Sequence, residues 1–239
     1  MAIMMDAGTA DDAPRSRDRR SHRAAARAED RAARRGEISG SGPVRGEQTP
    51  APNAGARGKF ALFGELLMTG LLVTVVSLAV ITLPAALAAG IRHLRRYVAA
   101  EDSRSTLFWA DVRAAIVPGL AVGAGALALT GILLLDIDLA RSGFLPGGAV
   151  IEVIGWLGLA VIAVALLTAA GAWTPEHGWR GALRAVPGLV RADVPGALYL
   201  AVTAAFVVIA TWALVPLLIP ALGCAALAVV AVPQRRRGR

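Results

Sequence analysis

Long stretches without charge alternate with short charged segments along most of this chain. From Phe60 onward, four stretches contain no Asp, Glu, Lys or Arg, and they cover 66–91, 114–135, 153–173 and 194–232. A single Arg or Asp at the centre of a membrane helix costs roughly 2.5–3.5 kcal/mol on insertion scales. The absence of charge over such lengths therefore predicts helices that cross a lipid bilayer.

Proline divides the two longest of these stretches. A helix crosses the hydrocarbon core in about 20 residues, so 114–135 and 153–173 have the length of single spans, whereas 66–91 and 194–232 are too long. Proline disfavours helical geometry at the residue before it. Turns are accordingly predicted at Thr82, Pro84, Pro216 and Pro220.

These features predict an all-α fold, a polytopic transmembrane bundle of five to six membrane helices. The approximate spans are 60–81, 84–100, 114–135, 152–173, 195–215 and 217–233. Few apolar residues separate Pro84 from Arg92. The segment 84–100 is therefore either a short span or a helix at the membrane interface, with arginine side chains that extend to the inner surface.

The arginines predict the orientation of the helices, because cytoplasmic loops of membrane proteins carry an excess of Arg and Lys. The loop after 114–135 instead carries Asp136, Asp138 and Glu152 against Arg141 alone, so it should lie outside. Both termini should then be cytoplasmic, in a multi-pass protein of the cytoplasmic membrane. The arginines that determine this topology are Arg92, Arg95, Arg96, Arg113, Arg180, Arg184, Arg191, Arg235, Arg236 and Arg237.

The two ends of the chain differ in composition from the helical part. Residues 1–58 are rich in Arg and Ala and then in Gly, Pro and Ser, a composition that cannot bury enough apolar surface to fold. We expect a disordered cytoplasmic tail over 1–58, a transmembrane domain over 59–234 and a basic cytoplasmic C-terminus over 235–239. Tryptophans such as Trp173 and Trp179 should lie near the inner boundary of the membrane.

No residue pattern indicates an enzyme, a cofactor or a metal site. The three histidines, His22, His93 and His177, have no metal-ligand spacing, and we expect them on the surface. Cys224 is the only cysteine and Lys59 the only lysine, and no phosphate-binding glycine loop is present. The net charge of +8 is spread over the chain, since residues 1–58 hold 11 Arg against 8 Asp and Glu. Nucleic acid is therefore not an expected partner.

One segment resembles a known family. The sequence ITLPAALAAGIRHLRRYVAAEDSRSTLFWADVRAA, at 81–115, is similar to the YesL-like bacterial membrane proteins, the domain of unknown function 624. The matching residues are Thr82, Pro84, Ala88, Arg95, Arg96, Phe108, Trp109, Val112 and Arg113. The resemblance implies the helical architecture and an association with carbohydrate-uptake systems, and it implies no active site.

Two functions are consistent with this pattern. The first is a noncatalytic accessory or regulatory component of a membrane system such as carbohydrate uptake, with the lipid bilayer and a solute importer as partners. The alternative is a small-solute transporter that uses proline-broken helices as binding elements. Ionisable residues such as Glu65 and Asp136 lie at the ends of the uncharged stretches, which argues against proton-coupled transport.

Overall fold

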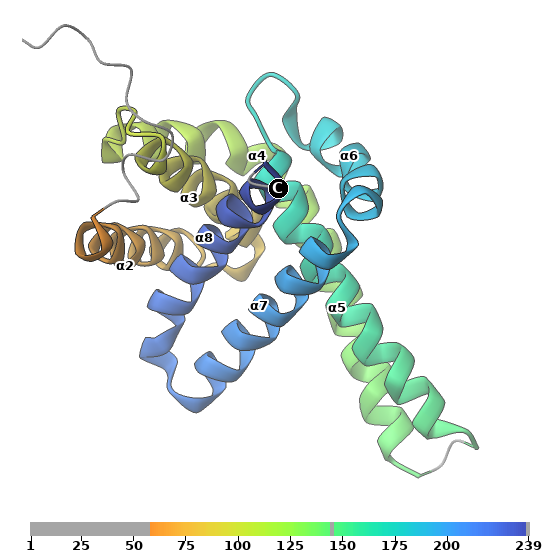
Figure 1. The fold of residues 1–239 in the computed structure, drawn as a ribbon. Coiled ribbons are helices and arrows are strands. Elements are labelled where there is room, and N and C mark those ends of the chain that lie inside the picture. The colour runs from red at the N-terminus through yellow and green to blue at the C-terminus, as the bar shows by residue number, and fades with distance from the viewer. Residues whose placement is uncertain (1–57, 144–145, 238–239) are drawn as a thin grey trace, which may run out of the picture. The chain divides into compact units, whose positions relative to one another are not determined.

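The described part of the chain is helical throughout. The computed structural model describes residues 58–143 and 146–237, so the predicted disordered tail lies outside it apart from Gly58. The elements are α2 (Lys59–Val76), η2 (Val80–Thr82), α3 (Leu83–Val98), α4 (Ser105–Arg141), α5 (Gly148–Ala172), α6 (Gly178–Ala192), α7 (Val194–Ala213), η3 (Val215–Leu217) and α8 (Leu218–Arg237) (Figure 1). The predicted all-α class is confirmed.

Five segments are long and apolar enough to cross a membrane. They are Lys59–Val76, Ser105–Arg141, Gly148–Ala172, Val194–Ala213 and Val215–Arg235. Many of their large apolar side chains are exposed, including Leu135, Val161 and Trp212. A surface of this kind requires lipid rather than water. The chain is thus a multi-pass membrane protein.

The predicted turns join successive helices. Thr82 lies in η2, between α2 and α3, with its hydroxyl 2.5 Å from the Val76 carbonyl oxygen and 2.6 Å from that of Ala79. Pro84 follows in the first turn of α3, where its missing N–H leaves no hydrogen bond unmade. Pro216 lies in η3 and Pro220 in the first turn of α8. Pro84 and Pro220 therefore lie where α3 and α8 begin.

Helix α3 is the most enclosed element of the described chain. It packs against α2, α4, α5 and α8, and its residues Ala85, Ala86, Ala88 and Ala89 are fully buried. Small side chains let neighbouring helices approach closely on several sides. The two alternatives predicted for 84–100, a short span or a helix at the membrane interface, both stay predictions.

Two hairpins make up most of the remainder. Helices α4 and α5 pair side by side, as do α7 and α8, and both hairpin turns lie at the end of the molecule opposite α6 (Figure 1). Helix α4 begins nine residues before the predicted span 114–135 and ends six residues after it. Its early start has a packing reason, since Phe108, Asp111 and Val112 are buried against the other helices.

Helix α6 occupies a segment to which the sequence analysis assigned no helix. Trp179 and Ala182 on this helix are buried, and Val186 is half-buried against the core. The polar residues Arg180, Arg184 and Arg191 are exposed. A helix with one apolar face and one arginine-rich face is typical of the boundary between membrane and water.

Candidate functional site at the arginine-rich end

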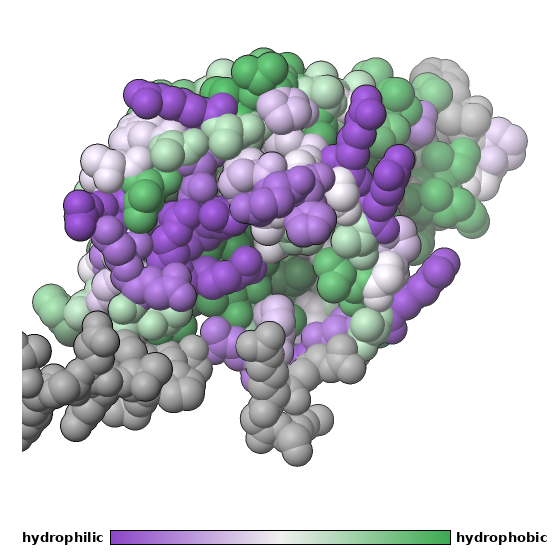
Figure 2. Space-filling model, turned by 90° about the horizontal axis from the view of Figure 1, so that it is seen from above, coloured by the Kyte–Doolittle hydropathy of each residue, from purple (hydrophilic) through white to green (hydrophobic). Residues whose placement is uncertain are grey.

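One end of the molecule gathers most of the charged side chains. It is the end at which α3 finishes, α4 begins and α6 lies (Figure 1). Viewed from this end, hydrophilic residues are spread over much of the face, with hydrophobic residues between them and along part of its edge (Figure 2). Most of the arginines that were predicted to determine the topology lie on α3, α4 and α6. The others, Arg235, Arg236 and Arg237, form the last turn of α8.

A buried carboxylate joins α4 to α3. Asp111 is 5% exposed, and its two oxygens pair with Arg92 Nε at 3.2 Å and Arg96 Nη2 at 2.7 Å. Arg92 Nε and Asp111 Oδ2 have no hydrogen-bond partner within the described residues. The contacts are therefore ion pairs whose angles do not suit a hydrogen bond, and Coulomb attraction holds them together.

This arrangement turns Arg92 and Arg96 toward α4, and their predicted place at the inner surface of the membrane stays a prediction. The side chains of Arg92 and Arg96 are only 23% and 17% exposed. They are four residues apart, which places them on one face of α3, and that face lies against α4. Arg95 and Arg113, by contrast, are exposed. The inward turn follows from Asp111, an acid in the predicted inner segment to which no role was assigned.

A second polar pair joins α3 to α2. His93 is 2% exposed, and its Nε2 lies 2.6 Å from Glu65 Oε1. The His93 ring also makes an edge contact with Phe108 of α4, at 6.2 Å between centroids. The prediction of a surface histidine is wrong for His93, because the flanking Arg92 and Arg96 bind α4 and so turn this part of α3 inward.

Two tryptophans predicted near the membrane boundary are packed inside the protein. Trp173 is 1% exposed and Trp179 is 3% exposed. Trp173 lies under Arg92, whose Cζ is 5.7 Å from the ring centroid, and the Trp179 indole donates a hydrogen bond of 2.9 Å to the Ala115 carbonyl. These rings fasten the link between α5 and α6 to α3 and α4.

That link, 173–177, carries Glu176 and His177. The Thr174 hydroxyl lies 3.0 Å from His177 Nδ1, and the backbone N–H of His177 donates to the same hydroxyl. Hydrogen bonds from its own backbone N–H and from Thr174 lower the pKa of the exposed Glu176 below its ordinary value. Glu176 and His177 therefore close a turn.

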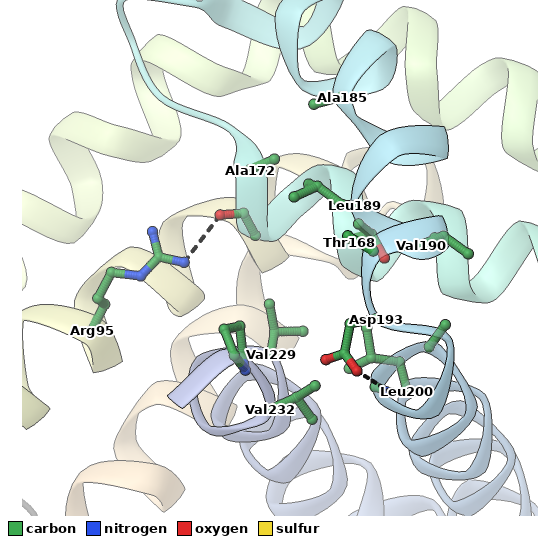
Figure 3. Close-up of a pocket in the computed structure, with 15 residues that line it drawn as sticks. Arg95, Thr168, Ala172, Ala185, Leu189, Val190, Asp193, Leu200, Val229 and Val232 are labelled. Carbon is green, nitrogen blue, oxygen red and sulfur yellow. Dashed lines mark hydrogen bonds between the residues drawn. The ribbon is translucent and has the colours of Figure 1, made fainter. Parts of the chain in front are cut away.

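A cavity of 660 Å³ opens beside this polar end, between α5, α6, α7 and α8 (Figure 3). Most of its wall is apolar, formed by side chains such as Leu200, Val229 and Val232. Two charged residues line it, Arg95 and Asp193. Arg95 reaches in from α3 and donates a hydrogen bond of 3.0 Å to the Gly171 carbonyl.

Asp193, at the start of α7, is held by two residues, Gly196 and Arg235. Its Oδ1 accepts a hydrogen bond of 3.0 Å from the Gly196 backbone N–H, which caps the helix. Arg235 of α8 lies 3.1 Å from the same oxygen, and its guanidinium stacks over Tyr199 at 4.7 Å. Asp193 therefore fixes the first turn of α7 to the last turn of α8.

A second, shallower groove of 820 Å³ lies between α4, α5 and α6. Its wall is also mainly apolar, with His177 and Arg180 at the α6 side. Elsewhere, Cys224 is a half-buried free thiol on α8. Across 58–143 and 146–237, no group of three or more His, Cys, Asp and Glu side chains is placed to hold a metal ion.

Comparisons with known proteins add no relative. Neither the family models, nor the curated proteins, nor the solved structures include a match to this chain. The resemblance of residues 81–115 to the YesL-like family therefore remains a prediction.

Proposed function

We propose that this protein is a noncatalytic accessory or regulatory subunit of a larger membrane assembly. Its partner would be another multi-pass membrane protein, such as a solute importer. The resemblance to the YesL-like family adds carbohydrate uptake as the system served. The proposal places the chain in the cytoplasmic membrane with both termini on the cytoplasmic side.

The uncovered outer part of the α4–α5 hairpin carries this proposal. In the apolar 18-residue part of α4, and likewise of α5, only 11% of the residues are buried. In the apolar 18-residue part of Val215–Arg235, which includes most of α8, 39% of the residues are buried. Gly125 and Gly131 lie on α4 with no neighbouring atom within 4 Å of the position a Cβ would take. Glycines on a membrane helix allow a second helix to approach closely, so this hairpin is suited to bind a helix of a partner.

The ion pairs at the arginine-rich end support a structural role for the charged residues. Asp111 binds two arginines, and Glu65 binds His93. Each carboxylate is thereby engaged with a neighbouring helix of the same chain. Groups engaged in this way position helices, and they suit a scaffold better than a site of chemical turnover.

The proposed orientation can be tested by labelling single cysteines in intact cells. Glu101→Cys and Pro146→Cys, each in a Cys224→Ala background, place a thiol at an exposed position on either side of α4. Because arginine-rich segments stay in the cytoplasm, we expect a membrane-impermeant maleimide to label position 146 in intact cells. Position 101 should be labelled only after permeabilisation, and the reverse pattern would reject the orientation.

The proposed partner surface can be tested by photo-crosslinking in native membranes. A photoreactive residue at position 131 should form an adduct with one membrane transport protein, identified by mass spectrometry. The same residue at Val208, a 67% exposed position of α7, is the matched control and should label lipid alone. A Gly131→Trp variant should weaken copurification of that transport protein. Labelling of lipid alone at both positions would contradict the proposal.

A further inference from the structure

We propose that the cavity between α5, α6, α7 and α8 binds one anionic phospholipid, with the lipid phosphate on Arg95 and an acyl chain along the apolar wall. This site is independent of the partner surface on α4 and α5. The proposal rests on three properties of the cavity, namely its wall, its charge and its position.

The wall suits a hydrocarbon chain. The side chains of Leu200, Val229 and Val232 line the cavity, together with that of Ala172 on α5 (Figure 3). The volume of 660 Å³ lies within the roughly 300–1,000 Å³ that is usual for small-ligand sites. Three of the four helices that form the cavity, α5, α7 and α8, are candidate membrane spans. Lipid is therefore the apolar molecule that surrounds this cavity.

The charge of the cavity favours an anion. Among the described residues, Arg95 has no carboxylate partner, and its one hydrogen bond goes to the Gly171 carbonyl. A guanidinium offers five N–H donors, which leaves several for a ligand. Asp193 is already neutralised by Arg235 and by the cap it forms on α7. The charge left over is therefore the positive charge of Arg95.

The position of Arg95 matches that of a lipid headgroup. It lies on α3 in the turn that also carries Arg92 and Arg96, at the arginine-rich end of the protein. Tyr199, which is 57% exposed beside Arg235, lies at the same end. Basic pockets between membrane helices on the cytoplasmic side recognise anionic headgroups. The phosphate would replace water on the free edge of Arg95, and the acyl chain would lie along the apolar wall of the cavity.

Lipid binding can be measured on the full-length protein in a neutral detergent. Dioleoyl-phosphatidylglycerol and dioleoyl-phosphatidylcholine would be titrated separately, and bound lipid would be counted by native mass spectrometry. We expect the wild-type protein to bind phosphatidylglycerol more tightly than phosphatidylcholine, and added salt should weaken that preference. Equal binding of the two lipids, or a preference that is unchanged by salt, would overturn the proposal.

Two variants separate the headgroup contact from the wall. Arg95→Gln should weaken phosphatidylglycerol binding by about tenfold and leave phosphatidylcholine unchanged, since only the charge-assisted contact is lost. Ala197→Phe, which fills the cavity, should weaken the binding of both lipids. Arg104→Gln is the matched control, because Arg104 is 78% exposed and pairs with Asp102; it should bind both lipids as the wild type does.

Inorganic phosphate distinguishes a lipid from a soluble anion. Phosphate at a concentration far above that of the lipid should not displace phosphatidylglycerol, because it gains nothing from the apolar wall. Full displacement would assign the site to a soluble anion and reject the lipid. If Arg95→Gln does not fold, the salt dependence of wild-type binding and the Ala197→Phe variant decide the outcome.

Discussion

Replacing Asp111 by Asn is expected to lower the free energy of unfolding by about 3–5 kcal/mol, because removal of one partner of a buried ion pair leaves uncompensated charge inside the protein. The substitution would leave two arginines without their carboxylate partner, because Arg92 and Arg96 both pair with Asp111. Unfolding in mixed micelles, followed by circular dichroism as denaturing detergent is added, measures the difference.

The matched control for Asp111 is Asp102→Asn. Asp102 also pairs with an arginine, Arg104, but their side chains are 52% and 78% exposed. Exposed pairs contribute about 0–1 kcal/mol, so this variant should unfold like the wild type. Equal effects of the two substitutions would show that burial of the Asp111 pair has no energetic importance.

A further variant tests whether the stability of the protein depends on the charges of this site or on the packing of its side chains. Arg92→Leu, Arg96→Met and Asp111→Leu together replace the ion pairs with apolar side chains. A buried ion pair can often be replaced in this way without loss of stability. We therefore expect the triple variant to be more stable than Asp111→Asn, and a lower stability would indicate a role for these charges beyond their mutual neutralisation.

Replacing Gly123 by Ala is expected to cost about 1–3 kcal/mol, the usual range for overpacking in a close-packed interior. A Cβ at this position would collide with the backbone carbonyl of Ile81 in η2. A backbone group cannot rotate away as a flexible side chain does, so α4 would have to move away from the turn between α2 and α3. The same unfolding measurement applies.

Gly131→Ala is the control for Gly123, on the same helix. No atom lies within 4 Å of the position its Cβ would take, and alanine is the better helix former by about 0.5–1 kcal/mol. This variant should therefore be as stable as the wild type or slightly more stable. Loss of stability at position 131 and none at position 123 would contradict the packing of α4 against η2.

The fold class was predictable because it depends on local properties of the sequence. Uncharged stretches of membrane length identify helices whatever their neighbours are, and Pro84 and Pro220 mark where helices begin again after a turn. The enclosure of α3 was not predictable in this way. A helix made of Ala85, Ala86 and other small residues suits a lipid-facing position and a crowded interior equally well, and only its partners decide between them.

The pairing of the charges also depends on tertiary structure, although part of it left a signal. The spacing of Arg92 and Arg96 places both on one helix face, and Asp111 lies between the buried Phe108 and Val112, so an inward acid could have been suspected. Nothing local identifies Glu65 as the partner of His93. The apolar spacing of Trp179, Ala182 and Val186 matches the period of a helix, and it is the sequence signal for α6.

The Asp111 site has a consequence for the order in which the protein is made. Arg92 and Arg96 leave the ribosome before the residue that neutralises them, and each would cost roughly 2.5–3.5 kcal/mol if it entered lipid alone. During synthesis, we therefore expect α3 to stay at the membrane surface until α4 arrives with its carboxylate. A later helix would then complete the insertion of the first ones, and a nascent chain truncated before position 111 should leave α3 accessible to protease.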